Sequence, residues 1–355
     1  MDLDGIKALQ KELSDMIGVS GHEDEVGDFI LSIIEKEALA DKAWKDPLGN
    51  ILAVIKSDKE NDRILFDAHT DEIGFMVSHI DQKGFLRFVP VGGWDIRILL
   101  GQSVVISTDS GKNFHGIIGS SPPHLSSPSE RKKIVSIDQM YIDIGLNSKE
   151  EVQASNITVG TVGTLVSPFL DLPNNMVRGK AFDDRTGCNV LIHLLRALKN
   201  NNSQKETYLF NFAVQEEFDR IGTVTGAYKL DPTMAIAVEN TTAADVPNIK
   251  LSKIPAFIGK GPAISVADKS ILCSPYLNKR IIENAKINNI PYQIKKPMYG
   301  KTNAGKIQLT REGVKSTVVS VPCRYIHSPT SLLKLDDIYY TIELLKAFIE
   351  NKASI

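Results

Sequence analysis

The chain has 355 residues, of which 42% are hydrophobic and 24% are charged, and its formal net charge is −2. This length suffices for one large domain or two ordinary ones with a well-buried core, and the composition is typical of a globular protein. Because there is no basic excess to attract nucleic acid or anionic membranes, small-molecule or peptide partners are favoured.

The start of the chain, "MDLDGIKALQKELSDMIG", is an acidic amphipathic pattern and not a signal peptide, and no apolar run reaches membrane-spanning length. The three cysteines, Cys188, Cys273 and Cys323, are far apart and form no C-x-x-C pair. This argues against a disulfide framework and against a thiolate zinc site. We therefore expect a cytoplasmic protein with no nucleic-acid or membrane partner.

The first 165 residues divide into two regions of different texture. Helical periodicity predicts helices over 5–18 and 23–38, and the turn "DPLGN" precedes the strand-like "ILAVI". From 73 to 165 the chain is rich in glycine, proline and short strand-like runs such as "GFLRFVPVGG" and "SVVIST". This second region predicts a small β-barrel or sandwich.

Helices and strands alternate after "GKAFDDRTGC", which predicts an α/β sheet. The simplest organisation is an α/β domain built from residues 1–72 and 166–355, interrupted by the β-rich insert 73–165. The later elements expected are a helix over 188–199, strands over 207–215 and 234–240, a helix near 279–289, a strand over 316–321 and a helix over 335–350.

Acidic residues and histidines occur where strand-like runs end or a helix starts. Ligands of an α/β sheet collect at the carboxyl ends of its strands, so these residues are candidates for a site. They are His69 and Asp71 in "ILFDAHTD", Asp183 and Asp184 in "GKAFDDR", Glu216 and Glu217 in "LFNFAVQEE", Glu239 in "MAIAVEN", and His327 in "VVSVPCRYIHSP".

Several carboxylates in one crevice repel one another unless cations offset their charge. Mixed imidazole and carboxylate ligands suit zinc, cobalt or manganese, and a two-metal site also needs a base that acts on water. We therefore expect two divalent metal ions per subunit, zinc by preference, with Glu216 as the general base. The expected ligands are His69, Asp183, Glu217, Glu239 and His327.

Each candidate also has a purely structural interpretation. Paired glutamates usually lie on a solvated face, and a lone histidine is more often structural than functional. Asp184 is interpreted as an acid at a helix N-terminus, where the helix dipole favours it. His69 and Asp71 favour function, because a carboxylate two residues along can orient a metal-binding imidazole.

Motifs along nearly the whole chain resemble, in the same order, those of the dinuclear-metal aminopeptidases, a family that includes glutamyl aminopeptidases and self-compartmentalising tetrahedral aminopeptidases. The resemblance implies a mixed-sheet α/β/α zinc-peptidase-like catalytic domain with an inserted β-barrel dimerisation domain. It also implies removal of N-terminal residues from peptide substrates, and dimers that assemble into a dodecamer. The motifs include "SGHEDEV", "DPLGN", "AHTDEIGFMV", "VGGWD", "GKAFDDRTG", "AVQEE", "TTAADVP" and "RYIHSP".

The resemblance also implies a role for each candidate residue, carried over by position. Asp183 resembles the bridging ligand, His69 and Glu239 the terminal ligands of one metal, Glu217 and His327 those of the other, Glu216 the general base, and Asp71 the acid behind His69.

Three positions depart from the family pattern. Glu239 stands where aspartate is frequent, which keeps an oxygen ligand but can change the metal preference. "GKTNAG" replaces "GTDAG", so Lys301 and Asn303 remove a negative charge near the substrate and add a positive one. Phe218 and Asp219 replace the usual "VG", which alters backbone freedom beside the base.

Other functions remain open. A deacylase of amino-acid derivatives would use the same water chemistry, and a non-catalytic assembly protein would fit the altered "GKTNAG" segment. An endoglucanase would use two carboxylates, but only Trp44 and Trp94 could serve as indole platforms for sugar. Lys295, Lys296 and Lys301 fit either an acidic substrate residue or a solvated face.

Overall fold

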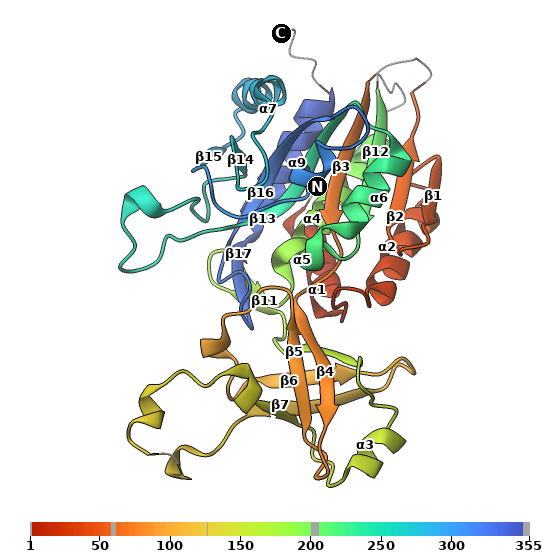
Figure 1. The fold of residues 1–355 in the computed structure, drawn as a ribbon. Helices are drawn as coiled ribbons and strands as arrows, with labels where there is room; N and C mark the ends of the chain where they lie inside the picture. Colours follow the sequence, from red (N-terminus) through yellow and green to blue (C-terminus); the bar gives the residue numbers. More distant parts are fainter. Residues whose placement is uncertain (1, 58–61, 126, 200–205, 351–355) are drawn as a thin grey trace.

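The computed structural model describes residues 2–57, 62–125, 127–199 and 206–350. An 11-stranded mixed sheet forms the centre of the larger domain (Figure 1). Its main path is β1 (Lys42–Lys45), β2 (Ile51–Ile55), β12 (Thr207–Ala213), β3 (Arg63–His69), β13 (Met234–Thr242), β16 (Lys315–Arg324), β17 (Ser331–Lys334), β11 (Met176–Gly179) and β10 (Leu170–Leu172); β14 (Ala263–Ser265) pairs with β16, and β15 (Gln293–Lys295) with β14.

Helices cover both faces of this sheet, because side chains of its central strands alternate between two apolar cores. Ile64, Phe66 and Ala68 of β3 join the larger core, while Leu65 joins the smaller one. The larger core contains residues of α1 (Leu3–Asp15), α2 (Asp24–Lys36), α4 (Phe182–Lys199), α7 (Pro275–Ile287) and α9 (Leu335–Glu350), and the smaller one residues of α6 (Ile221–Leu230) and α8 (Ala304–Ile307).

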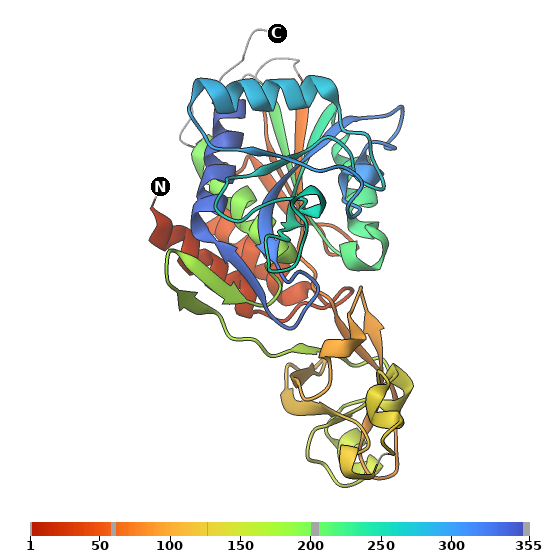
Figure 2. The same cartoon turned by 90° about the vertical axis from the view of Figure 1, so that its left-hand side faces the viewer.

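A closed barrel forms a separate lobe, which both ribbon views place beyond the end of β3 (Figures 1 and 2). Its own apolar core includes Phe75, whose ring stacks on Trp94 with a centroid distance of 5.0 Å. The barrel order is β4 (Gly74–Ile80), β5 (Leu86–Val91), β8 (Tyr141–Asp143), β7 (Asn113–Gly119), β6 (Ser103–Ser107) and β9 (Val162–Leu165), with α3 (Lys149–Ala154) beside it.

Short helical turns complete the described chain. The four-residue helix α5 (Glu216–Asp219) follows β12, and the remaining turns are 3-10 helices. These are Ile96–Ile98, Pro123–Leu125, Glu130–Lys132, Ile137–Gln139 and Leu251–Lys253.

The predicted α/β fold with a small barrel is confirmed. The helix predicted from position 188 begins earlier, because Arg185 and Thr186 are completely buried polar residues that obscure the apolar periodicity. The Arg185 guanidinium donates to the carbonyl oxygens of Thr70 and Leu13 at 2.6 Å, which allows it to lie inside the domain. Within the described residues, no helix combines the length and the apolar character needed to cross a bilayer.

A buried histidine on α4 makes the stability of this domain dependent on pH. Burial lowers the pKa of His193 to about 4, with a further contribution from Arg196, and its Nε2 has no hydrogen-bond partner among the described residues. The unfolded chain therefore binds a proton on His193 before the folded chain does, so this contribution to stability is lost as pH falls from 6.5 towards 4.

Wild-type protein should lose roughly 2 kcal/mol more unfolding free energy than His193→Gln between pH 7.5 and pH 5. Denaturant unfolding at the two pH values measures this difference. His22→Gln, at an exposed position, is the matched control and should keep the wild-type pH dependence. Equal losses in wild type and His193→Gln would contradict the assignment.

Candidate metal centre

Parallel strands bring the candidate residues to one edge of the sheet. β3 runs parallel to β12 and to β13, with His69 opposite Ala213, and β13 runs parallel to β16. Glu216 and Glu217 therefore follow the strand next to His69, while His327 follows β16. Because parallel strands end at the same edge, residues more than 250 positions apart in sequence reach one crevice.

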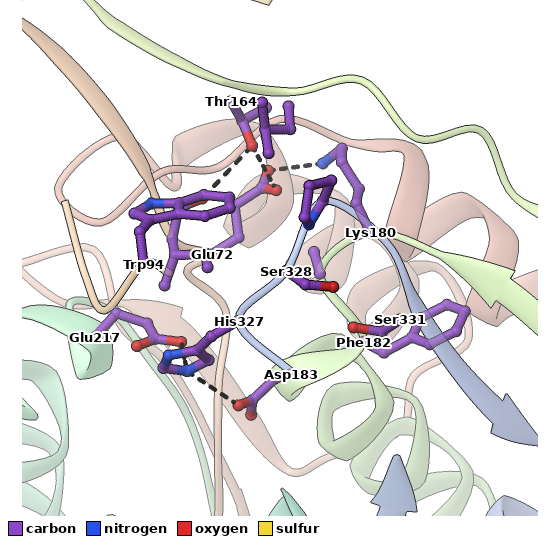
Figure 3. A pocket seen from close by; sticks show the side chains of 14 residues that line it. Glu72, Trp94, Thr164, Lys180, Phe182, Asp183, Glu217, His327, Ser328 and Ser331 are labelled. Atoms are coloured by element: carbon purple, nitrogen blue, oxygen red, sulfur yellow. Dashed lines mark hydrogen bonds and ion pairs between the residues drawn. The ribbon is translucent and has the colours of Figure 1, made fainter. Parts of the chain in front are cut away.

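Asp183 lies between the two histidines. The His69 Nε2 atom is 3.5 Å from Asp183 Oδ1, and the His327 Nε2 atom is 3.5 Å from Asp183 Oδ2. His327 Nε2 is also 3.0 Å from Glu217 Oε1, so this imidazole lies between two carboxylates (Figure 3). Asp183 thus presents one oxygen to each imidazole, as expected of a carboxylate that bridges two cations.

Two overlapping groups have the composition and spacing of metal ligands. The ligand atoms of His69, Asp183 and Glu217 lie within 4.8 Å of one another, as do those of His69, Asp184 and Glu239. The Asp184 oxygens, however, accept hydrogen bonds from the backbone N–H groups of Gly187 (3.1 Å) and His69 (3.2 Å). Asp184, whose own backbone is not helical, therefore caps the helical turn of α4 that follows it and ties α4 to β3, as the structural interpretation predicted.

The electrostatics of the cluster favour cation binding. Burial lowers the pKa of His327, but Asp183 and Glu217 outweigh this effect and raise it to about 11. Burial raises the pKa of Glu239 to about 8, because a charged carboxylate loses hydration there. In the absence of other cations, protonated imidazoles offset the charge of the carboxylates, and a carboxyl group that takes up a proton loses its negative charge. A metal ion would displace these protons, so the imidazole and carboxylate donor set fits divalent metals.

The comparison with known proteins identifies the family. The family model described as M42 glutamyl aminopeptidase matches residues 49–344. The chain belongs to this family. The resemblance to glutamyl and tetrahedral aminopeptidases is therefore confirmed, and with it an aminopeptidase family of metal-dependent hydrolases.

Individual members of the M42 family are similar over almost their whole length. The lysyl aminopeptidase of Pyrococcus furiosus is 33% identical, and the alignment covers 96% of each chain. The structure of a TET aminopeptidase from Thaumarchaeota archaeon SCGC AB-539-E09 is 39% identical, with a TM-score of 0.93 and 98% of this chain and 96% of that chain covered. The Pyrococcus horikoshii TET1 peptidase, which can assemble into a tetrahedron or a large octahedral shell, is 30% identical, with a TM-score of 0.84 and 97% and 99% covered.

Asp71 connects His69 with the pair of glutamates in this M42 chain. Its Oδ1 accepts the Glu216 N–H and its Oδ2 the Glu217 N–H, both at 2.9 Å, while Ser20 donates its hydroxyl to Oδ2 at 2.5 Å. The His69 Nδ1 atom is 3.3 Å from Asp71 Oδ1. One buried carboxylate therefore orients the imidazole and fixes the backbone that carries the paired acids.

A second buried carboxylate, that of Glu23, extends this anchoring, a role not predicted from the sequence. Glu23 Oε1 accepts the N–H groups of Gly21 (2.8 Å) and Gln215 (2.9 Å), and Gln215 has a left-handed backbone with φ +56°. Burial, followed by the charge of Asp71, raises the pKa of Glu23 to about 7. The available signal was the "SGHEDEV" motif, which contains Glu23.

The altered segment "GKTNAG" lies behind Glu239. The Asn303 N–H donates to Glu239 Oε1 at 2.9 Å, and the Asn303 side-chain amide donates to Asp67 Oδ1 at 2.6 Å. Asn303 is completely buried. Lys301, in contrast, is exposed and lines the same cavity as His69 and Glu216. The neutral residue at position 303 therefore contacts both Glu239, a proposed metal ligand, and the carboxylate of Asp67.

The metal centre opens into a cavity of ≈720 Å³. Phe218, Tyr299 and Lys295 are among its lining residues, together with His69 and Glu216. A much smaller pocket of ≈20 Å³ lies on the barrel side of His327, where Trp94, Glu72 and Lys180 meet Asp183 and Glu217 (Figure 3). Only the larger cavity has room for part of a peptide.

Replacing Glu23 should disturb the site through the backbone. In Glu23→Ala, the N–H groups of Gln215 and Gly21, whose hydrogen bonds to Glu23 are partly buried, lose their acceptor, which should cost about 1 kcal/mol of stability and shift the two glutamates. We expect kcat to fall roughly tenfold or more, while Glu23→Gln, which keeps an acceptor oxygen, retains more activity.

Kinetics on an aminoacyl-anilide, combined with calorimetric metal titration, measure this effect. Glu25→Ala, on the exposed side of the same helix, should behave like wild type. A Glu23→Ala protein that is less stable but has unchanged kcat would show that Glu23 has only a structural role.

Proposed function

We propose that this protein is a dinuclear-metal aminopeptidase that removes the N-terminal residue from peptides. The observation that carries the proposal is the position of Asp183, with one oxygen 3.5 Å from each of the imidazoles of His69 and His327. In the proposed site Asp183 would be the carboxylate shared by two ions. His69 and Glu239 complete the ligands of one ion, and Glu217 and His327 complete those of the other.

Zinc is the preferred ion, with cobalt or manganese as alternatives, because the donors are imidazole nitrogen and carboxylate oxygen. When bound, divalent ions supply Lewis acidity that makes water a better nucleophile and polarises an amide carbonyl. The longer side chain of Glu239 keeps oxygen ligation at the position where the resemblance implies aspartate, and its Oε1 is held by the Asn303 N–H.

Glu216 is the proposed general base. Its carboxylate lines the cavity, its side chain is 13% exposed, and its Oε2 lies 3.9 Å from His69 Nε2. Burial raises the pKa of Glu216 well above its ordinary value, and the neighbouring carboxylates Glu239 and Glu217 add to this. In the proposed site this carboxylate takes a proton from the attacking water and returns it to the leaving amine.

The polysaccharide alternative is disfavoured by the positions of the tryptophans. Trp44 lies in β1 beside a different pocket, and Trp94 lines the ≈20 Å³ pocket with its ring stacked on Phe75. Neither lines the larger cavity over the metal centre. A deacylase would use the same groups, so substrates with and without a free amine must distinguish the two activities.

Assembly is also proposed. The Pyrococcus horikoshii TET1 peptidase can assemble into a tetrahedron or a large octahedral shell, which supports a homo-oligomer. We propose that residues 73–165 form a dimerisation domain and that dimers assemble into a dodecamer in the cytoplasm. A barrel-side hollow of ≈350 Å³, lined by Leu100, Ile134 and Met140 among others, supports the dimer, because Leu100 and Ile134 are exposed apolar side chains.

Metal removal provides the direct test. Aminoacyl-anilides should be hydrolysed by protein reloaded with zinc, cobalt or manganese after chelation, but not by the chelated protein, because the proposed reaction requires Lewis acidity. N-acetylated versions of the same anilides are the control and should remain intact. Cleavage of the acetylated series alone would indicate a deacylase, and chelator-resistant activity would contradict the metal mechanism.

Glu216→Gln should bind metal but lose activity. The amide cannot accept the proton from water, so kcat should fall roughly 10²- to 10⁴-fold while the metal content of the purified protein stays at the wild-type level. Elemental analysis and steady-state kinetics on the best anilide measure both quantities. Wild-type kcat in this variant would exclude Glu216 as the base.

A further inference from the structure

The larger cavity is lined by cationic residues as well as by the acidic residues of the candidate metal centre. Lys269, Lys295 and Lys301 line it, whereas the Arg220 guanidinium, which also lines it, pairs with Asp219 at 2.9 Å. Lys269 and Lys301 are exposed at the opening. Lys295, in contrast, is buried, with only 3% of its surface exposed. This lysine is the unusual member of the group, because lysines are rarely buried without a partner.

The local strand directs Lys295 inwards. Lys295 is the last residue of β15, where the side chain of Ile294 is exposed and that of Lys295 is buried. Lys296, which follows it, does not line the cavity, and its ammonium group donates to the Leu251 carbonyl oxygen instead. Of these two adjacent lysines, only Lys295 is therefore available to a molecule in the cavity.

The Lys295 ammonium has neither an ion-pair partner nor a hydrogen-bond acceptor in the part of the chain that the structure describes, where only longer-range charges act on it. Asp268 contributes most to holding its charge against the effect of burial, but the Asp268 oxygens already accept from the N–H groups of Ser270 and Ile271 and from the Ser270 and Thr302 hydroxyls.

Among the described residues Lys180 is also buried, but its ammonium group has partners. The Lys180 ammonium lies 2.7 Å from Glu72 Oε1 and donates to the Met16 carbonyl oxygen at 2.5 Å. A buried ammonium group is unfavourable unless an anion compensates it. The contrast between Lys180 and Lys295 therefore leaves the Lys295 ammonium free to bind an anion in the cavity.

The metal-site carboxylates do not fill this role in the proposed holoenzyme. Lys295 lines the same cavity as Glu239 and Asp183, and both carboxylates contribute to its electrostatic environment. Two divalent ions would offset the charges of Asp183, Glu216, Glu217 and Glu239. With these charges offset, the three lysines leave the cavity wall positive and suited to a carboxylate.

We infer that Lys295 is the recognition residue of a carboxylate subsite that selects acidic peptides. This inference rests on the proposed aminopeptidase function. Lys295 lines the same cavity as Glu239, which favours the side chain of an N-terminal glutamate or aspartate as the source, since that group lies nearest the scissile bond. A free C-terminal carboxylate of a dipeptide is the other source of the same chemistry. Family membership does not decide this specificity, because a lysyl aminopeptidase is among the relatives.

Matched substrate pairs test the subsite on the metal-loaded protein. Glutamyl- and glutaminyl-anilide differ only in the charge of the side chain, and Leu-Leu and Leu-Leu-amide differ only in the C-terminal charge. Wild type should hydrolyse the glutamyl substrate at least about tenfold faster in kcat/KM than the glutaminyl one, and the Leu-Leu pair equally.

Lys295→Met keeps a long side chain without the charge, and it should reduce the glutamyl-to-glutaminyl ratio to near one by loss on the glutamyl substrate. Lys296→Met is the control and should keep the wild-type ratio. If wild type instead prefers Leu-Leu over Leu-Leu-amide and Lys295→Met loses this preference, the subsite is retained but binds the C-terminal carboxylate. Equal rates within both pairs, or a ratio unchanged in Lys295→Met, would overturn the inference.

Calorimetric binding of glutamate and glutamine to the metal-loaded protein gives a readout that does not need turnover. Wild type should bind glutamate at least about tenfold more tightly, and Lys295→Met should not discriminate. If no substrate is hydrolysed but this binding preference holds, the proposed function fails and the subsite stands. If other anilides are hydrolysed without preference for either charge, the function stands and the subsite fails. Equal binding without any hydrolysis would overturn both.

Discussion

The concentration of buried carboxylates at one edge of the sheet is the constraint on which the rest of this structure depends. Asp183, Glu216, Glu217 and Glu239 all line the same cavity, and none can be charged there without a compensating cation. His69 and His327 lie on either side of Asp183, so the cluster is arranged for positive charge on both sides of one carboxylate. A sequence that only required a stable fold would place apolar residues at these strand ends.

The backbone around the cluster is fixed by further carboxylates that are not among the residues lining the cavity. Asp71 accepts the N–H groups of Glu216 and Glu217, and Glu23 accepts the N–H of Gln215. Three consecutive N–H groups at the start of α5 are thus held by acids from two distant segments. This explains why two adjacent glutamates can face the same crevice: the strand ends at Ala213, and the anchored turn, rather than strand alternation, sets their directions.

The sequence was sufficient for the fold class and for the convergence of the strand-end residues, because both follow from periodicity and from parallel strand order. It was insufficient for Glu23, whose partner Gln215 is almost 200 positions away, and for the contrast between Lys295 and Lys296. The orientation of the short strand β15 decides whether Lys295 or Lys296 is buried, and the sequence does not give this orientation. The start of α4 was hidden for a related reason, since the polar residue Arg185 is buried only because Thr70 and Leu13 offer it carbonyl oxygens.

The departure at Asn303 bears on whether the site has lost its chemistry. Its side-chain amide donates to Asp67, which also accepts from Asn211 (2.7 Å) and Thr223 (3.1 Å), and burial raises the pKa of Asp67 to about 7. A carboxyl group is therefore present beside position 303 although residue 303 itself is neutral. The Asn303 N–H still holds Glu239. A site without catalytic activity would not require the buried carboxyl group of Asp67, with its three hydrogen-bond donors, next to the residue that holds Glu239. This network therefore favours retained metal chemistry over a purely structural role for the cluster.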